Sequence, residues 1–185
     1  GTFLQETKIL QHIGKGVLIF RTDDGGQTWT RQDIQAATNL SAPTSAHFIT
    51  PEEGWILLED DTILHNDNGG QTWQLLPRTT SWSLNDVYFV NSNVGWAVGR
   101  ASGGEKNIAY AGPNIMYFTV NGGECWAPFH VTDNSDFYEI TFDGESNLWV
   151  VGDFGTLLRR SLLPLPTGVE QCGIRVTTLG TIKRE

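Results

Sequence analysis

One eight-residue pattern occurs three times in this chain: Thr22-Asp23-Asp24-Gly25-Gly26-Gln27-Thr28-Trp29, Asn66-Asp67-Asn68-Gly69-Gly70-Gln71-Thr72-Trp73 and, more loosely, Thr119-Val120-Asn121-Gly122-Gly123-Glu124-Cys125-Trp126. The closing tryptophans are 44 residues (73 − 29) and 53 residues (126 − 73) apart. A motif that returns at such a period indicates a chain built from repeated structural units.

A second repeated element has a tryptophan at its second position: Gly54-Trp55-Ile56-Leu57-Leu58, Gly95-Trp96-Ala97-Val98-Gly99 and Leu148-Trp149-Val150-Val151-Gly152. Gly1-Thr2-Phe3-Leu4-Gln5-Glu6 is similar to this element, so we expect the chain to begin inside a repeat. Six of the seven tryptophans fall on the two repeated positions, and Trp82 is the exception. Such a distribution favours one structural unit that is used several times.

Short runs of β-branched and aromatic residues alternate with Gly, Asn and Asp clusters, which is typical of strands joined by turns. The predicted strands are Ala46–Ile49, Gly54–Glu59, Thr62–His65 and Thr72–Leu76, then Asp86–Val90, Gly95–Gly99, Ile115–Thr119 and Cys125–Phe129, then Phe137–Phe142, Leu148–Gly152 and Thr156–Arg160. Four short strands in about 45 residues is the size of one propeller blade. We therefore predict an all-β fold, a β-propeller with four-stranded antiparallel blades.

About four blades are expected over residues 1–161, and the first of them is incomplete at its N-terminal end. Residues 162–185 form a divergent C-terminal segment, in which Gly173–Leu179 is the candidate closing strand. An open stack of blades would leave sheet edges and apolar faces uncovered. We expect either that Gly173–Leu179 pairs with the blade of Phe3 and Leu4, or that another copy or a partner covers both ends.

The eight-residue pattern predicts a tight turn between two antiparallel strands. Gly26, Gly70 and Gly123 suit positive φ, and the side chains of Asp24, Asn68 and Asn121 are expected to bond the turn backbone. Trp29, Trp73 and Trp126 are expected to fill the gap between neighbouring blades. A calcium loop would need a closing carboxylate where the chain has Thr-Trp, so we predict a structural turn without metal. No cofactor motif is present either.

The composition narrows the class of partner. Twelve Lys and Arg against 21 Asp and Glu give a net charge of −9, which argues against a nucleic-acid partner. No apolar run is long enough to span a bilayer. The chain starts at Gly1 rather than Met, so targeting information is expected upstream. Cys125 and Cys172 are either one disulfide or two buried thiols.

The turn pattern resembles the Asp box, Ser/Thr-x-Asp-x-Gly-x-Thr-Trp, of sialidases, xyloglucan-cleaving glycosidases, sortilin-type receptors and propeller proteins that assist photosystem II assembly. Together with Gly95-Trp96-Ala97-Val98-Gly99, it is most similar to the photosystem II assembly and stability factor family and its bacterial relatives. That family has seven blades, more than the four expected here. The resemblance implies a protein-binding scaffold in an extracytoplasmic compartment: periplasm, thylakoid lumen or secreted.

In a propeller, the connections between strands two and three share one face with the connections between blades, and the Asp boxes lie on the other face. The expected partner-binding residues on that first face are Arg78, Trp82, Arg100, Lys106 and Tyr110. Trp82 is the strongest candidate, since large aromatic side chains dominate binding energy. Arg31 is assigned to a blade connection, and one of Arg159 and Arg160 is expected to face outward.

An enzyme is the alternative to weigh. Glycosidases need two carboxylates within about 5 to 9.5 Å, and Glu59, Asp60, Asp61 and Asp153 are all predicted in connections on the candidate face. However, the sequence has no Phe-Arg-Ile-Pro segment, no Gly-x-Ser-x-Gly elbow and no histidine pair at metal spacing. The leading hypothesis is a non-catalytic scaffold that binds a protein. The alternatives are a fragment of an Asp-box glycosidase or carbohydrate-binding propeller, and an extracellular receptor-like module.

Overall fold

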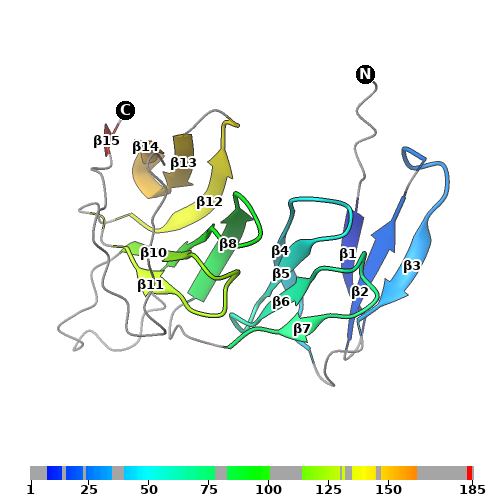
Figure 1. The fold of residues 1–185 in the computed structure, drawn as a ribbon. Coiled ribbons are helices and arrows are strands. Elements are labelled where there is room, and N and C mark those ends of the chain that lie inside the picture. The colour runs from blue at the N-terminus through cyan, green and yellow to red at the C-terminus, as the bar shows by residue number, and fades with distance from the viewer. Residues whose placement is uncertain are drawn as a thin grey trace.

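The computed structural model describes residues 8–13, 16–22, 24–34, 40–77, 83–100, 114–129, 131, 135–144, 147–161 and 183–184. These residues form four antiparallel sheets that follow one another along the chain (Figure 1). We number the sheets as blades one to four. The all-β propeller architecture predicted from the repeats is thereby confirmed, with one three-stranded and three four-stranded sheets.

Each blade is a meander of neighbouring strands, apart from a short 3-10 turn, Asp153–Gly155, in blade four. The strands of blades one and two are β1 (Lys8–Ile13), β2 (Gly16–Arg21), β3 (Thr30–Asp33), β4 (Pro43–Phe48), β5 (Gly54–Leu58), β6 (Ile63–Asn66) and β7 (Gln74–Leu75). Those of blades three and four are β8 (Ser83–Phe89), β9 (Gly95–Arg100), β10 (Asn114–Thr119), β11 (Ala127–Pro128), β12 (Phe137–Phe142), β13 (Asn147–Gly152), β14 (Leu157–Ser161) and β15 (Lys183–Arg184).

Blade one corrects one register prediction. Gly1–Glu6 was expected to be the strand equivalent to β5, but β1 takes that place and pairs with β2, from Lys8 opposite Arg21 to Ile13 opposite Gly16. The hairpin between these strands is shorter than the β5–β6 connection, so the strand lies closer in sequence to its Asp box. The glycine-aromatic match at Gly1 was therefore misleading, and Gly1–Glu6 lies outside the described residues.

In blade four, the fourth strand is β15, which pairs with β14 through Leu158 opposite Arg184 and Arg159 opposite Lys183. The strand predicted at Gly173–Leu179 lies outside the described residues, as do Phe3 and Leu4.

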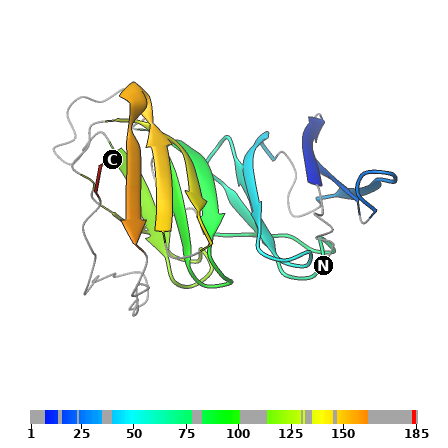
Figure 2. The ribbon, with the colours of Figure 1, turned by 90° about the horizontal axis from the view of Figure 1, so that it is seen from above.

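The core lies between blades rather than inside any one of them. Figure 2 shows the sheets side by side in chain order, with their faces toward one another. Side chains alternate along a strand, so Ile56 and Leu58 of β5 pack toward blade one while Trp55 and Leu57 pack toward blade three. Because both of its faces are covered, every residue of β5 is buried.

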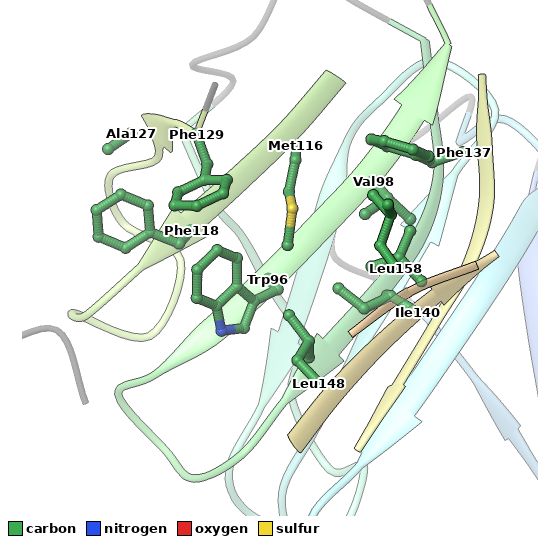
Figure 3. Packing of buried hydrophobic residues seen from close by; sticks show 11 residues of the cluster. Trp96, Val98, Met116, Phe118, Ala127, Phe129, Phe137, Ile140, Leu148 and Leu158 are labelled. Atoms are coloured by element: carbon green, nitrogen blue, oxygen red, sulfur yellow. The ribbon is translucent and has the colours of Figure 1, made fainter. Parts of the chain in front are cut away.

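The largest cluster joins blades three and four (Figure 3). Trp96 lies at its centre, with Phe118 and Phe129 at ring-centroid distances of 5.4 and 5.5 Å. The guanidinium of Arg160, a buried residue, stands 5.3 Å from the Trp96 ring and 4.5 Å from the Phe129 ring. Burial lowers the pKa of Arg160 from its ordinary value. Arg159 is exposed, so the prediction that one of this pair faces outward is confirmed.

The three Asp boxes share one hydrogen-bond frame. In the first, Asp24 Oδ1 accepts from the Thr28 amide at 2.9 Å and the Thr22 hydroxyl at 2.8 Å, and the Thr28 hydroxyl donates to Oδ2 at 2.6 Å. Asn68 and Asn121 accept the corresponding amide, from Thr72 and Cys125, each at 3.0 Å. The six paired glycines all have positive φ, between 70° and 95°. The Asp24 oxygens are thus occupied by the turn itself, as a structural turn requires.

The box tryptophans differ in burial. Trp73 and Trp126 are 8% and 7% exposed, as predicted, whereas Trp29 is 39% exposed. Trp73 packs with Val17 and Ile19 of blade one, and Trp126 packs with blade two, so each box tryptophan covers the preceding blade. No blade precedes the first one among the described residues, so the packing of Trp29 between two blades stays a prediction.

Cys125 occupies the place of Thr28 and Thr72 in the third box and is disulfide-bonded. Of the two alternatives, a disulfide or two thiols, the disulfide is present. Cys172, the chain's other cysteine, lies outside the described residues.

Candidate functional site

One edge of the sheets gathers the connections that differ most between blades. The first strand of each blade begins where the second ends, as the pairs Pro43 with Leu58, Ser83 with Arg100 and Phe137 with Gly152 show. The connection from strand two to strand three therefore emerges beside the connection from the preceding blade. The Asp boxes lie at the opposite edge, beyond Asn66 and Thr119. We call the first edge the connection face.

On the connection face, the turn between β13 and β14 differs most clearly from the equivalent turn of blade two, and the residue that differs is Phe154. Its side chain is 91% exposed. Its φ of 54° lies in the left-handed region, which costs a bulky residue on the order of 1–2 kcal/mol. The turn is nevertheless well anchored, because the Asp153 amide donates to the Asp136 carbonyl at 2.9 Å and the Gly152 amide to the Thr156 carbonyl at 3.0 Å.

The equivalent turn of blade two has a polar side chain at the position of Phe154. There the Leu58 amide donates to the Thr62 carbonyl at 2.9 Å, which matches the bond from Gly152 to Thr156 and aligns Asp60 with Phe154. The Asp60 side chain is bonded on both sides, by the Ser41 hydroxyl at 2.8 Å and the Thr62 amide at 3.2 Å. Blade four thus replaces a polar side chain that ties its own turn with an apolar ring that points into solvent.

Tyr138 lies beside this turn. It is 49% exposed, and its hydroxyl donates to Asp153 Oδ1. That hydrogen bond raises the pKa of Tyr138, burial and the negative charges of Asp153 and Asp136 act in the same direction, and the positive charge of Arg100 opposes them. The phenol is therefore held protonated, with its hydroxyl bonded to a carboxylate.

The carboxylates weighed as a glycosidase pair are held in structural roles where the structure describes their bonds. Asp61 Oδ1 accepts the Leu84 amide at 2.7 Å, which ties the turn of blade two to blade three. Asp60 is bonded within its own turn, and Asp153 accepts from Tyr138. Among the described residues, no group of three or more His, Cys, Asp or Glu side chains is placed to hold a metal ion.

The inner strands β4, β8 and β12 carry a second polar group, centred on Asp86. Asp86 Oδ1 accepts from the Ser45 hydroxyl and from the Val87 amide at 2.9 Å, and Oδ2 accepts from the Ile140 amide at 2.9 Å. Asn85 donates to the Phe137 carbonyl at 2.6 Å. Burial raises the pKa of Asp86, against the opposing effect of these hydrogen bonds. The group links three blades and is structural.

Of the five predicted partner-binding residues, Arg100 is described: it is exposed, at the end of β9, and on the connection face. Arg78, Trp82, Lys106 and Tyr110 lie outside the described residues. Arg31, expected in a blade connection, instead belongs to β3 and pairs with Phe20. The sequence analysis missed Phe154 and Tyr138. The sequence signal that could have identified Phe154 is that blade four has a phenylalanine where blade two has Asp60.

A family model described as photosynthesis system II assembly factor YCF48 matches residues 8–82. The photosystem II assembly protein Ycf48 of Synechococcus sp. (strain JA-3-3Ab) is 28% identical, over 83% of this chain and 58% of its own length. The photosystem II assembly lipoprotein Ycf48 of Synechococcus sp. (strain CC9902) is 27% identical, over 62% of this chain and 31% of its own length. The chain thus spans less than two thirds of either relative.

Solved structures show the same fold. A GH74 enzyme of Niastella koreensis superposes with a TM-score of 0.62 at 16% identity, over 92% of this chain and 26% of that one. YCF48 from Cyanidioschyzon merolae superposes with a TM-score of 0.55 at 18% identity, over 95% of this chain and 57% of that one. Four blades, three of which have an Asp box between their last two strands, define a BNR-type β-propeller. Within that class, the chain is related to the photosystem II assembly factors. Among the described residues, no helix is long and apolar enough to cross a membrane.

Proposed function

We propose that this chain is a non-catalytic propeller scaffold that binds a polypeptide on its connection face, in the manner of an assembly factor. The observation that carries the proposal is Phe154, 91% exposed and held at positive φ by an anchored turn. A strained backbone that presents a bulky apolar ring to solvent points to a binding role. Interface energy concentrates in a few aromatic and arginine side chains, and Tyr138 and Arg100 lie on the same face.

A polypeptide is favoured over a sugar because two acidic side chains of the connection face are bonded to backbone amides: Asp60 to that of Thr62 and Asp61 to that of Leu84. The names of the relatives, which are assembly proteins, agree with a protein partner. One of them is named as a lipoprotein, and the disulfide at Cys125 requires an oxidising environment. We therefore also propose an extracytoplasmic location.

The test uses a photo-crosslinking residue at position 154 and, as a control, at position 75. Leu75 is 46% exposed on the outer strand β7 of blade two, so it matches Phe154 in character but lies elsewhere. The polypeptide that crosslinks from position 154 is identified by mass spectrometry, and its affinity is measured with purified variants. We expect Phe154→Ser to weaken binding about tenfold or more, as for a hot-spot aromatic, and Leu75→Ser to leave it unchanged.

Two results would contradict the proposal. One is equal affinity of wild type and Phe154→Ser for the crosslinked polypeptide. The other is hydrolysis or millimolar-or-better binding of xyloglucan or sialylated oligosaccharides, which would favour the glycosidase or carbohydrate-binding alternative.

A further inference from the structure

The joint between blades two and three shows how an Asp box satisfies a buried tryptophan of the blade before it. Trp55 is fully buried, and its Nε1 donates to the Gly122 carbonyl at 3.0 Å. Gly122 belongs to the Asp box of blade three, so this box supplies the acceptor. A buried N–H that lacks such an acceptor destabilises the fold.

The joint between blades three and four has the equivalent tryptophan but no Asp box beside it. Trp96 holds in β9 the place that Trp55 holds in β5, and it is also fully buried. After β14 the sequence continues Ser161-Leu162-Leu163-Pro164-Leu165-Pro166, without the Gly-Gly-x-x-Trp of an Asp box. Among the described residues, the Trp96 Nε1 has no hydrogen-bond partner. Figure 3 shows this nitrogen on the side of the indole away from Phe129.

Arg160 brings a positive charge to the same joint. It lies two residues after Leu158 on β14, so its side chain points toward blade three, as that of Leu158 does. Arg160 is 5% exposed, and its guanidinium lies 5.3 Å from the Trp96 ring and 4.5 Å from the Phe129 ring. Its Nε and Nη1 are buried and have no hydrogen-bond partner in the described part of the chain.

Arg160, rather than Trp96, distinguishes this joint from the others. Trp73 and Trp126 also have buried indole nitrogens without a partner among the described residues, but an indole is neutral. A buried charge is far more costly to leave unpaired, and aromatic rings offset only part of that cost. Arginine does not lose its proton in proteins. Burial lowers the pKa of Arg160, and no carboxylate of the described residues opposes that effect.

This donor group lies inside the stack, between two described blades, and at the Asp-box edge. Arg160 pairs with Leu148 near the start of β13, whereas the connection face is at the other end of these strands. The group is therefore separate from Phe154 and Tyr138. A ligand bound there would take the place that an Asp box fills in the joint between blades two and three.

We propose that the joint between blades three and four binds an organic carboxylate, to which Arg160 and the Trp96 Nε1 donate hydrogen bonds. A carboxylate carries one negative charge, which equals the charge of Arg160, and its oxygens accept several hydrogen bonds. A phosphate dianion would bury a second charge without a partner. The rings of Trp96 and Phe129 contact the apolar part of the acid and exclude water, which strengthens the ion pair.

An NMR titration with sodium acetate tests this site directly. The ¹⁵N-labelled chain is titrated at constant ionic strength, with sodium chloride replaced by sodium acetate, and the Trp96 signal is identified by its loss in Trp96→Phe. We expect the indole N–H of Trp96 and the Nε–H of Arg160 to shift together and to saturate with one dissociation constant. Sodium phosphate should give no saturating shift of either signal.

Arg160→Met and Arg159→Met are the matched pair of variants, because the two arginines are neighbours and Arg159 is exposed. Methionine fills a space similar to that of the arginine stem, so Arg160→Met should keep the fold. Acetate should raise the melting temperature of wild type and of Arg159→Met but not that of Arg160→Met, because a ligand that binds only the folded state stabilises it.

Three results would overturn the proposal. One is a Trp96 signal that does not move in acetate up to about 100 mM, where even a weak millimolar site would be filled. Another is an equal response to acetate in Arg160→Met. The third is a shift of the Trp96 and Arg160 signals in Glu170→Gln without ligand. Glu170 is the one acidic residue between Ser161 and Lys183 in the sequence, and that shift would make it the acceptor.

Discussion

At the residue scale, the same residue type contributes differently to stability in different blades, because its burial depends on the neighbouring blade. Trp73 and Trp29 hold identical places in their Asp boxes, but Trp73 is 8% exposed and packs with Val17 and Ile19, and Trp29 is 39% exposed. The Asp-box sequence therefore determines the turn, and the neighbouring blade determines how much the tryptophan stabilises the fold.

This difference in burial predicts that replacing the two tryptophans with alanine lowers the free energy of unfolding by unequal amounts. Trp73→Ala should lower the free energy of unfolding by about 3–5 kcal/mol, as for other large buried aromatic residues. Trp29→Ala, its matched control, should cost the monomer less than half as much, because much of its area is already in water. Urea unfolding of dilute protein measures both. A cost below about 1 kcal/mol for Trp73→Ala would mean that this residue is not part of the core.

The lowered pKa of Asp24 predicts that the stability of the fold decreases at acidic pH. Hydrogen bonds from the Thr28 hydroxyl, the Thr28 amide and the Thr22 hydroxyl lower its pKa from 3.8 to about 2. Because the folded pKa lies below the unfolded one, the unfolded state takes up the proton first, and this contribution to stability is lost as the pH falls from about 4 toward 2. It is fully present above that range.

Asp24→Asn is the matching variant, since Asn68 and Asn121 fill this place in the other boxes. We expect the variant to keep the fold and to lose less stability than wild type between pH 5 and pH 2. Urea midpoints across that range give the comparison. Parallel pH profiles for the two proteins would show that Asp24 does not titrate with folding.

At the scale of the element, side chains rather than backbone ladders join the inner strands of neighbouring blades. Asp86 on β8 accepts hydrogen bonds from Ser45 on β4 and from the Ile140 amide on β12. A carboxylate can do this because both of its oxygens accept. In Asp86→Asn, one side of the group becomes a donor, so at least one bonded amide loses its acceptor.

Asp86→Asn should therefore destabilise the fold by about 1–3 kcal/mol, the cost of leaving a buried polar group unsatisfied. Ser45→Ala is the control, because it removes one donor and leaves Asp86 bonded to Val87 and Ile140; it should cost about 0.5–1.5 kcal/mol. Chemical denaturation provides both values. If Asp86→Asn were neutral while Ser45→Ala was costly, the link to blade four would carry little of the stability.

The strands that the sequence predicted well are those with turn-forming residues at both ends. The strands of blades two and three are bracketed by Gly54 or Gly95 on one side and an Asp box on the other, and they lie within a few residues of the predicted runs. β1 lacks such a leading glycine, so its register was missed. Phe154 was missed because left-handed φ is expected of Gly, Asn or Asp, and only the folded turn shows a phenylalanine there.

At the scale of the whole molecule, the third Asp box differs from the others by a covalent bond. Cys125 keeps the turn amide bond, to Asn121 Oδ1 at 3.0 Å, but has no hydroxyl like those of Thr28 and Thr72, and it is disulfide-bonded. A cross-link stabilises by restricting the unfolded chain, with a contribution that grows slowly with loop length. The two cysteines lie 47 residues apart in sequence (172 − 125).

Reduction should therefore lower the free energy of unfolding by about 2–4 kcal/mol, as measured by urea unfolding with and without a phosphine reductant. Cys125→Ala and Cys125→Thr separate the two contributions, since both remove the cross-link and should make the protein insensitive to reductant. Cys125→Thr restores the hydroxyl of the other boxes and should be more stable than Cys125→Ala by about 0.5–1.5 kcal/mol, one hydrogen bond. If reduction left the wild-type midpoint unchanged, the unfolded chain would not be restricted by this bond, and the stability of the stack would rest on the joints between blades.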